Sequence, residues 1–409
     1  MDSKNIVIIG TLDTKGEQIR FLKDQITQEG HKTSVFDLSM GGAPLFEGDI
    51  TPQEIAQAGG EDIENIRSSK DRATITQAMQ VGAIEKIKQL FSDGKVDGII
   101  AAGGISMAIT GSNIMKAIPF GVPKMIVCPA AMPSYVAHCF GSMDVAIMQS
   151  IVEFAGLNKL LKDVLARAAG AICGMAEKAS FSETISLSRN SIAITQFGFS
   201  ENCASYVLQY LEEKGYTVYP FHAQGISDRA MDSLISQGYF DGVIDIVPAG
   251  VIEEIFEGNR AAGRERLEAA GKRGIPQVIG PCALNWTGCG PTRKQSEKYA
   301  SRERVLKVDK LRAATRYNVQ ELKIGAKAYA EKLNKSKGPV KIIFPLQGWS
   351  SIDREGTILY KPDEDMIFIK EMKKYLKPAI EIEYIDCNLE EPPYARALVD
   401  SLDSMMKKK

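Results

Sequence analysis

Short apolar runs alternate along the chain with polar segments and with stretches of helical period. Residues 6–9 are apolar, the polar stretch GTLDTKGE follows, and Ile19, Leu22 and Ile26 then recur at helical spacing. Residues 33–38 (TSVFDL) form the next strand-like segment. This order predicts a strand, a loop, a helix and a second strand, which together make a βαβ unit with a right-handed crossover.

The same order of segments returns near the middle of the chain. Residues 192–195 are apolar, the loop QFGFSEN follows, and a helical stretch leads to another apolar run at residues 217–221. Further along, VDGIIAAGG matches FDGVIDIVPAG, and GVPKMIVCPAAMPS matches GIPQVIGPCALNW, with the order kept in both halves. Matches that stay in register predict duplication of one α/β unit.

The two halves are separated by a polar, serine-rich segment at residues 176–190. The chain has 409 residues, and a single core stops growing at roughly 250 to 300 residues, so we expect two domains. Residues 1–178 are predicted to form a nucleotide-binding α/β lobe, and residues 190–409 a second lobe with a substrate or partner site. Both are expected to be Rossmann-like, with mostly parallel sheets, and the cleft between them is a candidate ligand or partner site.

Each half also contains segments without a counterpart in the other. Residues 51–54 (TPQE) are typical of a capping box with proline at the first helical position. In the second half, residues 291–333 predict a long polar helical region. The chain then closes with a predicted strand at 340–344, a helix at 365–375 and a strand at 380–385.

Composition narrows the classes of partner. Lys and Arg (50) balance Asp and Glu (51), giving a formal charge of -1, which argues against a nucleic-acid or anionic-membrane partner. No apolar stretch reaches the roughly 18 residues that cross a membrane, so we expect a cytoplasmic protein. The seven cysteines form no CxxC pair and there are three histidines, so no structural metal is expected.

The loop GTLDTKGE is the first candidate for holding phosphate. It lies between a predicted strand and helix, where free backbone N–H groups and the helix dipole favour an anion. Thr11, Thr14 and Lys15 add donors. The loop matches neither the Walker A order nor G-x-G-x-x-G, and an alternative interpretation is a plain capping box between Thr14 and Glu17.

A second glycine-rich turn follows the strand predicted at VDGIIAA. Gly103 and Gly104 allow the backbone to approach a ligand closely, and Ser106 is expected to be the N-cap of the next helix. The alternative is a tight strand-to-helix turn that needs glycine for packing.

Arg72 stands at the predicted start of a helix that begins at Asp71, where a positive charge opposes the helix dipole and favours an anion. The alternative is an exposed arginine paired with Asp71 or Glu85. Asp37, at the end of the second strand, is a weaker candidate for a ribose hydroxyl, because it follows the first glycine at a longer interval than in dinucleotide folds.

The motifs GTLDTKGE, DLSMGG, KDRA, AAGG followed by GVPK, and FAGLN carry a resemblance over nearly the whole chain. Together they resemble the family of largely uncharacterised proteins that share the ATP-binding domain of the tomato mosaic virus resistance protein. This chain diverges within that pattern, because Ile105, Met107 and Ala108 interrupt the glycine-rich turn.

The resemblance implies a two-lobed protein whose first lobe binds ATP, with Mg accompanying the phosphates. Carried over by position, the nucleotide site would comprise Leu12, Asp13 and Thr14, a residue at or near Ser39, Arg72, and the turn from Gly103 to Ser106. It also implies a separate barrel-domain protein as a partner, and a symmetric homodimer is expected on general grounds.

An enzyme is the competing hypothesis. His222 follows a predicted strand of the second lobe, and Cys282 follows another, close in sequence to Asn285, Trp286 and Cys289. A base and a nucleophile brought together at strand ends would suit a hydrolase or lyase of a small acyl or carboxylated metabolite, with Asp353 orienting His222. The alternatives are a buried structural cysteine and a structural histidine.

Overall fold

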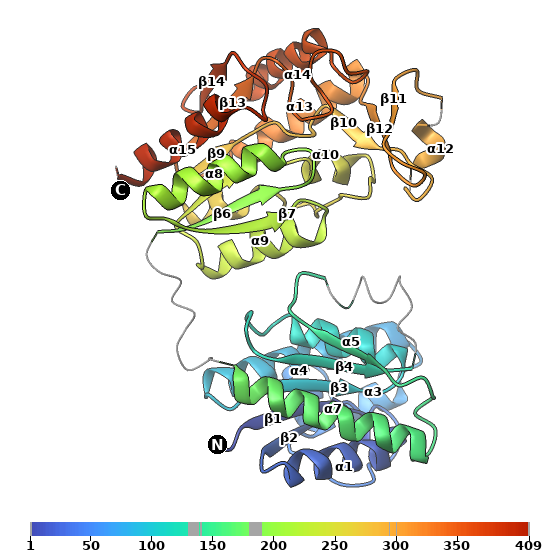
Figure 1. Cartoon of the computed structure of the whole chain (residues 1–409). Helices are drawn as coiled ribbons and strands as arrows, with labels where there is room; N and C mark the ends of the chain where they lie inside the picture. Colours follow the sequence, from blue (N-terminus) through green and yellow to red (C-terminus); the bar gives the residue numbers. More distant parts are fainter. Residues whose placement is uncertain are drawn as a thin grey trace. The chain divides into compact units, whose positions relative to one another are not determined.

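The computed structural model describes residues 2–129, 139, 141–179, 190–293, 295–299 and 301–407. The chain folds into two compact units, Met1–Ile185 and Ser186–Lys409 (Figure 1). Most of the join predicted at residues 176–190 lies outside the described residues.

A parallel sheet forms the centre of unit 1, with strand order β2-β1-β3-β4-β5. Side chains alternate across it: Ile6 and Ile8 of β1 join one core, while Val7 and Ile9 join the other. The strands are β1 (Asn5–Gly10), β2 (Lys32–Asp37), β3 (Gly98–Ala102), β4 (Lys124–Cys128) and β5 (Ala146–Gln149).

Helices cover both faces of this sheet (Figure 1). On one face α1 (Leu12–Gln28) packs beside α7 (Lys159–Lys178), and on the other α4 (Arg72–Ser92) packs beside α5 (Ile105–Met115). The short helices α2 (Pro52–Ala58) and α3 (Ile63–Ser68) lie next to one another, and α2 also packs on α4. The predicted capping box of α2 is confirmed, since the Thr51 side chain accepts from the Glu54 amide and the Glu54 side chain from the Thr51 amide.

Unit 2 is built on a parallel sheet of six strands, in the order β14-β13-β9-β8-β6-β7. Its strands are β6 (Ser191–Gln196), β7 (Thr217–His222), β8 (Gly242–Asp245), β9 (Gln277–Ile279), β13 (Val340–Pro345) and β14 (Glu381–Ile385).

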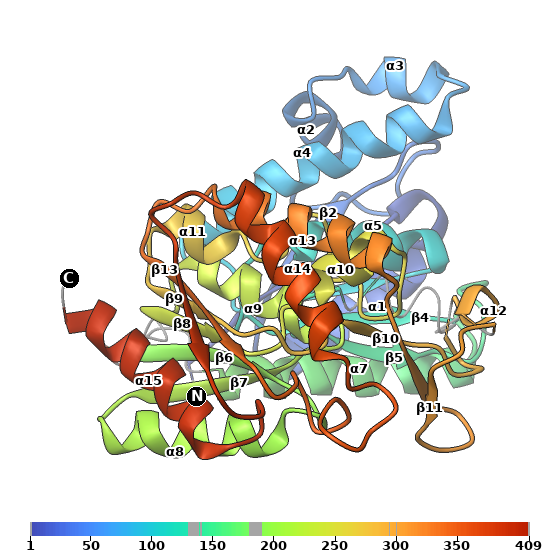
Figure 2. The ribbon, with the colours of Figure 1, turned by 90° about the horizontal axis from the view of Figure 1, so that it is seen from above.

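The helices of unit 2 also form two layers. The first layer contains α8 and α15, which pack together, and α13 and α14 of the second lie side by side (Figure 2). The helices are α8 (Glu201–Glu213), α9 (Ile226–Gln237), α10 (Gly250–Ile255), α11 (Ala269–Arg273), α13 (Val319–Leu333), α14 (Pro362–Tyr375) and α15 (Pro392–Lys407). None of the helices in the described part of the chain is long and apolar enough to cross a membrane.

The strand order supports duplication. The matched sequence segments fall on β1 and β6, β2 and β7, β3 and β8, and β4 and β9. The order β2-β1-β3-β4 of unit 1 therefore repeats as β7-β6-β8-β9 in unit 2. The predicted fold class, two Rossmann-like α/β lobes with mostly parallel sheets, is confirmed.

One predicted element is wrong. Residues 291–333 are not one long helical region, because the segment before α13 contributes two strands to a small antiparallel sheet of order β10-β12-β11. Its strands are β10 (Trp286–Gly288), β11 (Val305–Lys307) and β12 (Ala313–Arg316), and α12 (Ser296–Tyr299) is a single short turn. Pairing between β10 and β12, which lie far apart in sequence, overrides the local helical pattern.

Candidate functional site

A pocket of about 540 Å³ opens at the carboxyl ends of the strands of unit 1. Its lining comes from α4 and from the segments that follow β1, β2, β3, β4 and β5. The chain leaves β1 toward β2 on one side, while β3 lies on the other side of β1, so the pocket stands at the topological switch point of the sheet. Ligands of open α/β sheets bind at this position.

The structure brings most of the predicted phosphate-binding residues together around this pocket. Three separate segments of the sequence contribute them. The predicted residues that line the pocket are Thr11, Lys15, Arg72, Gly103, Gly104 and Ser106.

The other predicted residues organise the loop after β1. Leu12 is buried and its amide donates to Asp37 Oδ1 at 3.0 Å, while the Asp13 amide donates to Ser39 Oγ at 3.0 Å. The first two amides of α1 are therefore bound by side chains of this chain, contrary to the expectation that they are free for a ligand. Thr14 is exposed, and its hydroxyl lies 2.9 Å from that of Thr11, so the Thr14 hydroxyl bonds there rather than forming the alternative T-x-x-E capping box.

Asp37 forms hydrogen bonds within the protein, whereas the sequence predicted a contact with a ribose hydroxyl. Its carboxylate is buried and also accepts from the Ser39 amide at 3.0 Å and from the Ser39 hydroxyl. Burial raises the pKa of Asp37, and the hydrogen bonds from Ser39 and Leu12 oppose that rise. Asp37 and Ser39 thus fix the conformation of the loop between β1 and α1.

Helix α5, which follows the glycine turn after β3, has no side-chain cap in the described part of the chain. Gly104, not Ser106, is the N-cap of α5, and no side chain among the described residues caps it. The first amides of a helix have no intrahelical partner, so those of α5 are available to a ligand at the wall of the pocket. Ser106 adds an exposed hydroxyl in the first turn.

Two cations line the same pocket. Arg72 is the first residue of α4 and is exposed, and it forms no ion pair with any described residue. The alternative pairings do not occur, because the Asp71 carboxylate accepts from Thr74 and Ala73, and Glu85 pairs with Lys88. Lys15 lies at a kink of α1, and its ammonium donates to the Phe154 carbonyl at 2.6 Å.

The lining also includes apolar side chains, namely Leu38, Met40, Met79 and Met107. A lining with both cations and apolar side chains suits a ligand that carries an anionic group and a flat or apolar body. Thr76 and Thr110 also line the pocket and were not predicted from the sequence. Thr76 was detectable, because it lies one helical turn after Arg72 on the same face of α4.

The predicted catalytic residues of unit 2 lie in different surroundings. His222 is exposed at the end of β7, whereas Cys282 is fully buried. Burial raises the pKa of the Cys282 thiol well above its usual range, which disfavours a thiolate nucleophile. None of His222, Cys282 or Asp353 lines the described pockets.

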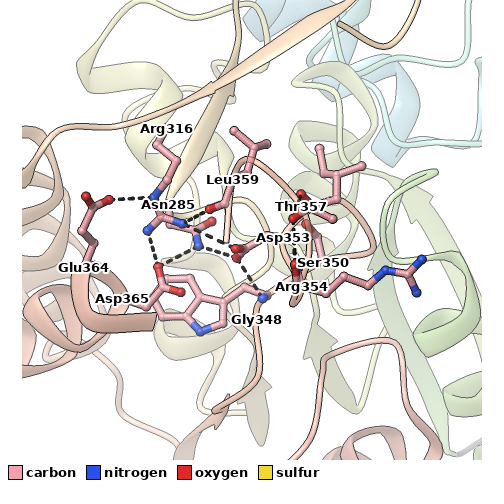
Figure 3. A network of polar contacts seen from close by, with 12 residues as sticks. Asn285, Arg316, Gly348, Ser350, Asp353, Arg354, Thr357, Leu359, Glu364 and Asp365 are labelled. Carbon is pink, nitrogen blue, oxygen red and sulfur yellow. Dashed lines mark hydrogen bonds and ion pairs between the residues drawn. The ribbon is translucent and has the colours of Figure 1, made fainter. Parts of the chain in front are cut away.

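Asp353 belongs to a buried polar network instead of orienting His222 (Figure 3). Asp353 Oδ2 accepts from Asn285 Nδ2 at 2.7 Å and from the Trp349 amide at 3.0 Å. Asn285 also donates to Asp365 at 2.8 Å, and the Arg316 guanidinium reaches both carboxylates. The network joins β12, α14 and the loop after β13, so its observed contacts are structural.

The two buried carboxylates of this network influence one another. Burial first, and then the negative charge of Asp353, raise the pKa of Asp365 to about 7, while Arg316 and Asn285 oppose that rise. Burial likewise raises the pKa of Asp353.

Sequence comparisons cover nearly the whole chain. It is 34% identical to a UPF0261 protein of Clostridium tetani over 99% of this chain and 100% of that protein. It is 26% identical to the ToMV resistance protein Tm-1(GCR237) of Solanum lycopersicum, over 98% of this chain and 55% of that protein. Among solved structures, a Methanocaldococcus jannaschii UDP-GlcNAc 2-epimerase in complex with UDP-GlcNAc and UDP covers 99% of this chain and 93% of its own, at 10% identity. Its TM-score of 0.23 carries no argument about this chain.

The family assignment follows from both halves of the sequence. Residues 4–180 match the N-terminal domain of the uncharacterised protein family UPF0261, and residues 189–406 match its C-terminal domain. The chain is therefore a member of the UPF0261 family and a homologue of the tomato Tm-1 proteins.

Proposed function

We propose that unit 1 binds a nucleotide, with ATP as the first candidate, and that the phosphates lie between the N-terminus of α5 and Arg72. The observation that carries this proposal is the convergence of an uncapped helix N-terminus and an unpaired arginine on one pocket at the switch point of the sheet. Helix N-termini and arginine both favour phosphate.

The base and ribose would lie beside the apolar side chains of Met40 and Met79, which line the pocket. Among the described residues no group of His, Cys, Asp or Glu could hold a metal ion. Mg²⁺ would therefore enter with the phosphates, which is usual for a cation that keeps several of its waters. Glu153, which lines the pocket, is the carboxylate available to it.

Calorimetric titration with ATP, ADP and NAD, each with and without Mg²⁺, tests this proposal. We expect ATP to bind and Arg72→Gln to weaken binding about tenfold or more, because a charge-assisted hydrogen bond contributes roughly 1.5–3 kcal/mol. Arg67→Gln is the matched control, since Arg67 pairs with Glu64 on α3 and does not line the pocket. Absence of nucleotide binding, or equal affinities for Arg72→Gln and the wild type, would reject the site.

The alternative proposal, a hydrolase or lyase of a small acyl or carboxylated metabolite that uses His222, has less support. The exposed imidazole lies at a strand end, as such a base should, but Cys282 is buried and Asp353 is bound elsewhere. Equal turnover of pooled metabolites by wild type and His222→Ala would remove His222 from any mechanism.

Two proposals about partners rest on the family resemblance and on general symmetry. They are a separate barrel-domain protein and a symmetric homodimer. Light scattering on the purified chain tests the dimer, and a monomer at all concentrations would reject it.

A further inference from the structure

Unit 2 contains a pocket at the place equivalent to the unit 1 pocket. Phe197 and Phe199 follow β6, Gln224 follows β7, and Glu253 belongs to the helix after β8. Because β6, β7 and β8 repeat β1, β2 and β3, both pockets stand at the switch point of their sheets. The unit 2 pocket is smaller, about 50 Å³, and its lining replaces the glycine-rich turns by aromatic side chains.

Arg260 is the central charge of this pocket and is 4% exposed. Its Nε and Nη2 donate to Glu253 Oε1 at 3.1 and 2.7 Å, and Nη2 also donates to the Trp286 carbonyl at 3.1 Å. The guanidinium lies 4.5 Å from the centre of the Trp286 ring. Glu253 receives a further bond from the Thr287 hydroxyl at 2.7 Å, so its carboxylate is fully engaged.

The buried polar atoms of the lining that remain unpaired are donors. Arg260 Nη1, Trp286 Nε1 and Arg293 Nε are buried atoms that have no hydrogen-bond partner in the described part of the chain. Arg293 also forms no ion pair with a described residue, whereas Arg312, at the rim, pairs with Asp309 at 2.6 Å. Among these lining side chains no buried acceptor is left unpaired. An excess of cationic donors calls for an anionic acceptor.

We propose that this pocket binds the carboxylate of a small organic acid, with Arg293 and Arg260 as its donors. The apolar part of the acid would lie against Phe199, Val308 and Ala313, which also line the pocket. The size of the pocket limits the ligand to a few heavy atoms beyond the carboxylate. A phosphate ion would satisfy the arginines but would leave the apolar wall without a partner. The site is independent of the nucleotide proposal, because it uses only residues of unit 2.

Binding of sodium butyrate to the full-length chain tests the proposal. Tryptophan fluorescence reports on the site because Trp286 lines it, and calorimetry provides a second readout at the same ionic strength. We expect saturable binding of butyrate, weaker binding of inorganic phosphate, and no binding of butylamine. Arg293→Gln should weaken butyrate binding about tenfold or more, since one charge-assisted donor is lost.

Arg264→Gln is the matched control, because Arg264 is exposed and lies outside the pocket; it should bind butyrate as the wild type does. Far-ultraviolet circular dichroism of Arg293→Gln confirms that the variant is folded. The proposal is overturned if butyrate fails to bind in both measurements, if Arg293→Gln binds as tightly as the wild type, or if phosphate binds as tightly as butyrate.

Discussion

At the residue scale, the two neighbouring glycines of the turn after β3 have different surroundings. A Cβ added at Gly104 would meet no atom within 4 Å, whereas one added at Gly103 would lie 2.9 Å from the Met107 Cβ. Gly104 therefore leaves space at the wall of the pocket, and Gly103 is needed for packing.

We expect Gly104→Ala to keep the stability of the wild type and to weaken ATP binding by roughly 1 kcal/mol or more, because its methyl group would occupy space beside the uncapped amides of α5. Gly103→Ala should instead lower the melting temperature, since Met107 must shift. Calorimetry and thermal unfolding of both variants separate these effects. Unchanged nucleotide affinity in Gly104→Ala would place the phosphates elsewhere.

Asp365 gives a prediction about pH. Its pKa in the folded chain is about 7, while an unfolded aspartate titrates near 3.9. Between these values the native state holds a proton that the unfolded chain has lost, so the contribution of Asp365 to the stability of unit 2 is greatest at the acidic end and falls as pH rises toward 7. This contribution has a slope of up to about 1.4 kcal/mol per pH unit.

Asp365→Asn removes this titration and should flatten that fall. Urea unfolding followed by tryptophan fluorescence measures it for unit 2 alone, because the only two tryptophans, Trp286 and Trp349, both lie there. Asp363→Asn is the control, since Asp363 is exposed in the first turn of the same helix. An identical pH dependence in wild type and Asp365→Asn would contradict the assigned pKa.

At the element scale, the start of α1 depends on a carboxylate from the neighbouring strand. Asp37 Oδ1 accepts from the amides of Leu12 and Ser39, and Ser39 in turn accepts from the Asp13 amide. Asp37→Ala leaves buried donors without a partner and should destabilise unit 1 by about 1–3 kcal/mol.

Asp37→Asn keeps one oxygen acceptor and should retain most of that stability. Hydrogen exchange of peptides covering residues 10–16 provides the measurement, and we expect faster exchange in the alanine variant than in the asparagine variant. Equal protection in Asp37→Ala and the wild type would show that the loop does not depend on this carboxylate.

Strand β12 was predicted wrongly, as part of a helical region. Polar residues between 291 and 318 have no strong period of two, yet β12 is a strand because it pairs with β10, and its Arg316 reaches Asp353 and Asp365 in the buried network. Those partners come from a distant part of the chain, so a local pattern cannot predict the strand.

At the scale of the whole molecule, the two units should respond to different ligands. A ligand at 100 times its dissociation constant stabilises the native state by about 2.7 kcal/mol. We expect ATP to raise the unfolding transition of unit 1, seen by circular dichroism, and to leave the tryptophan transition of unit 2 unchanged. Butyrate should do the reverse. A tryptophan transition that shifts with ATP would contradict the assignment of the nucleotide to unit 1.

The sequence by itself determined the repeated strand and helix order, because side-chain period follows directly from backbone geometry. It also selected Thr11, Lys15, Arg72 and the glycine turn as neighbours, since loops after parallel strands meet at one edge of the sheet. Only the tertiary structure decided that Asp37 and Ser39 accept hydrogen bonds from the first amides of α1, whereas no described side chain caps α5. It also decided that Arg260 and Arg293 line one pocket of unit 2. Such pairings join residues far apart along the chain, and their choice depends on burial and on which partner is nearest, neither of which a linear pattern specifies.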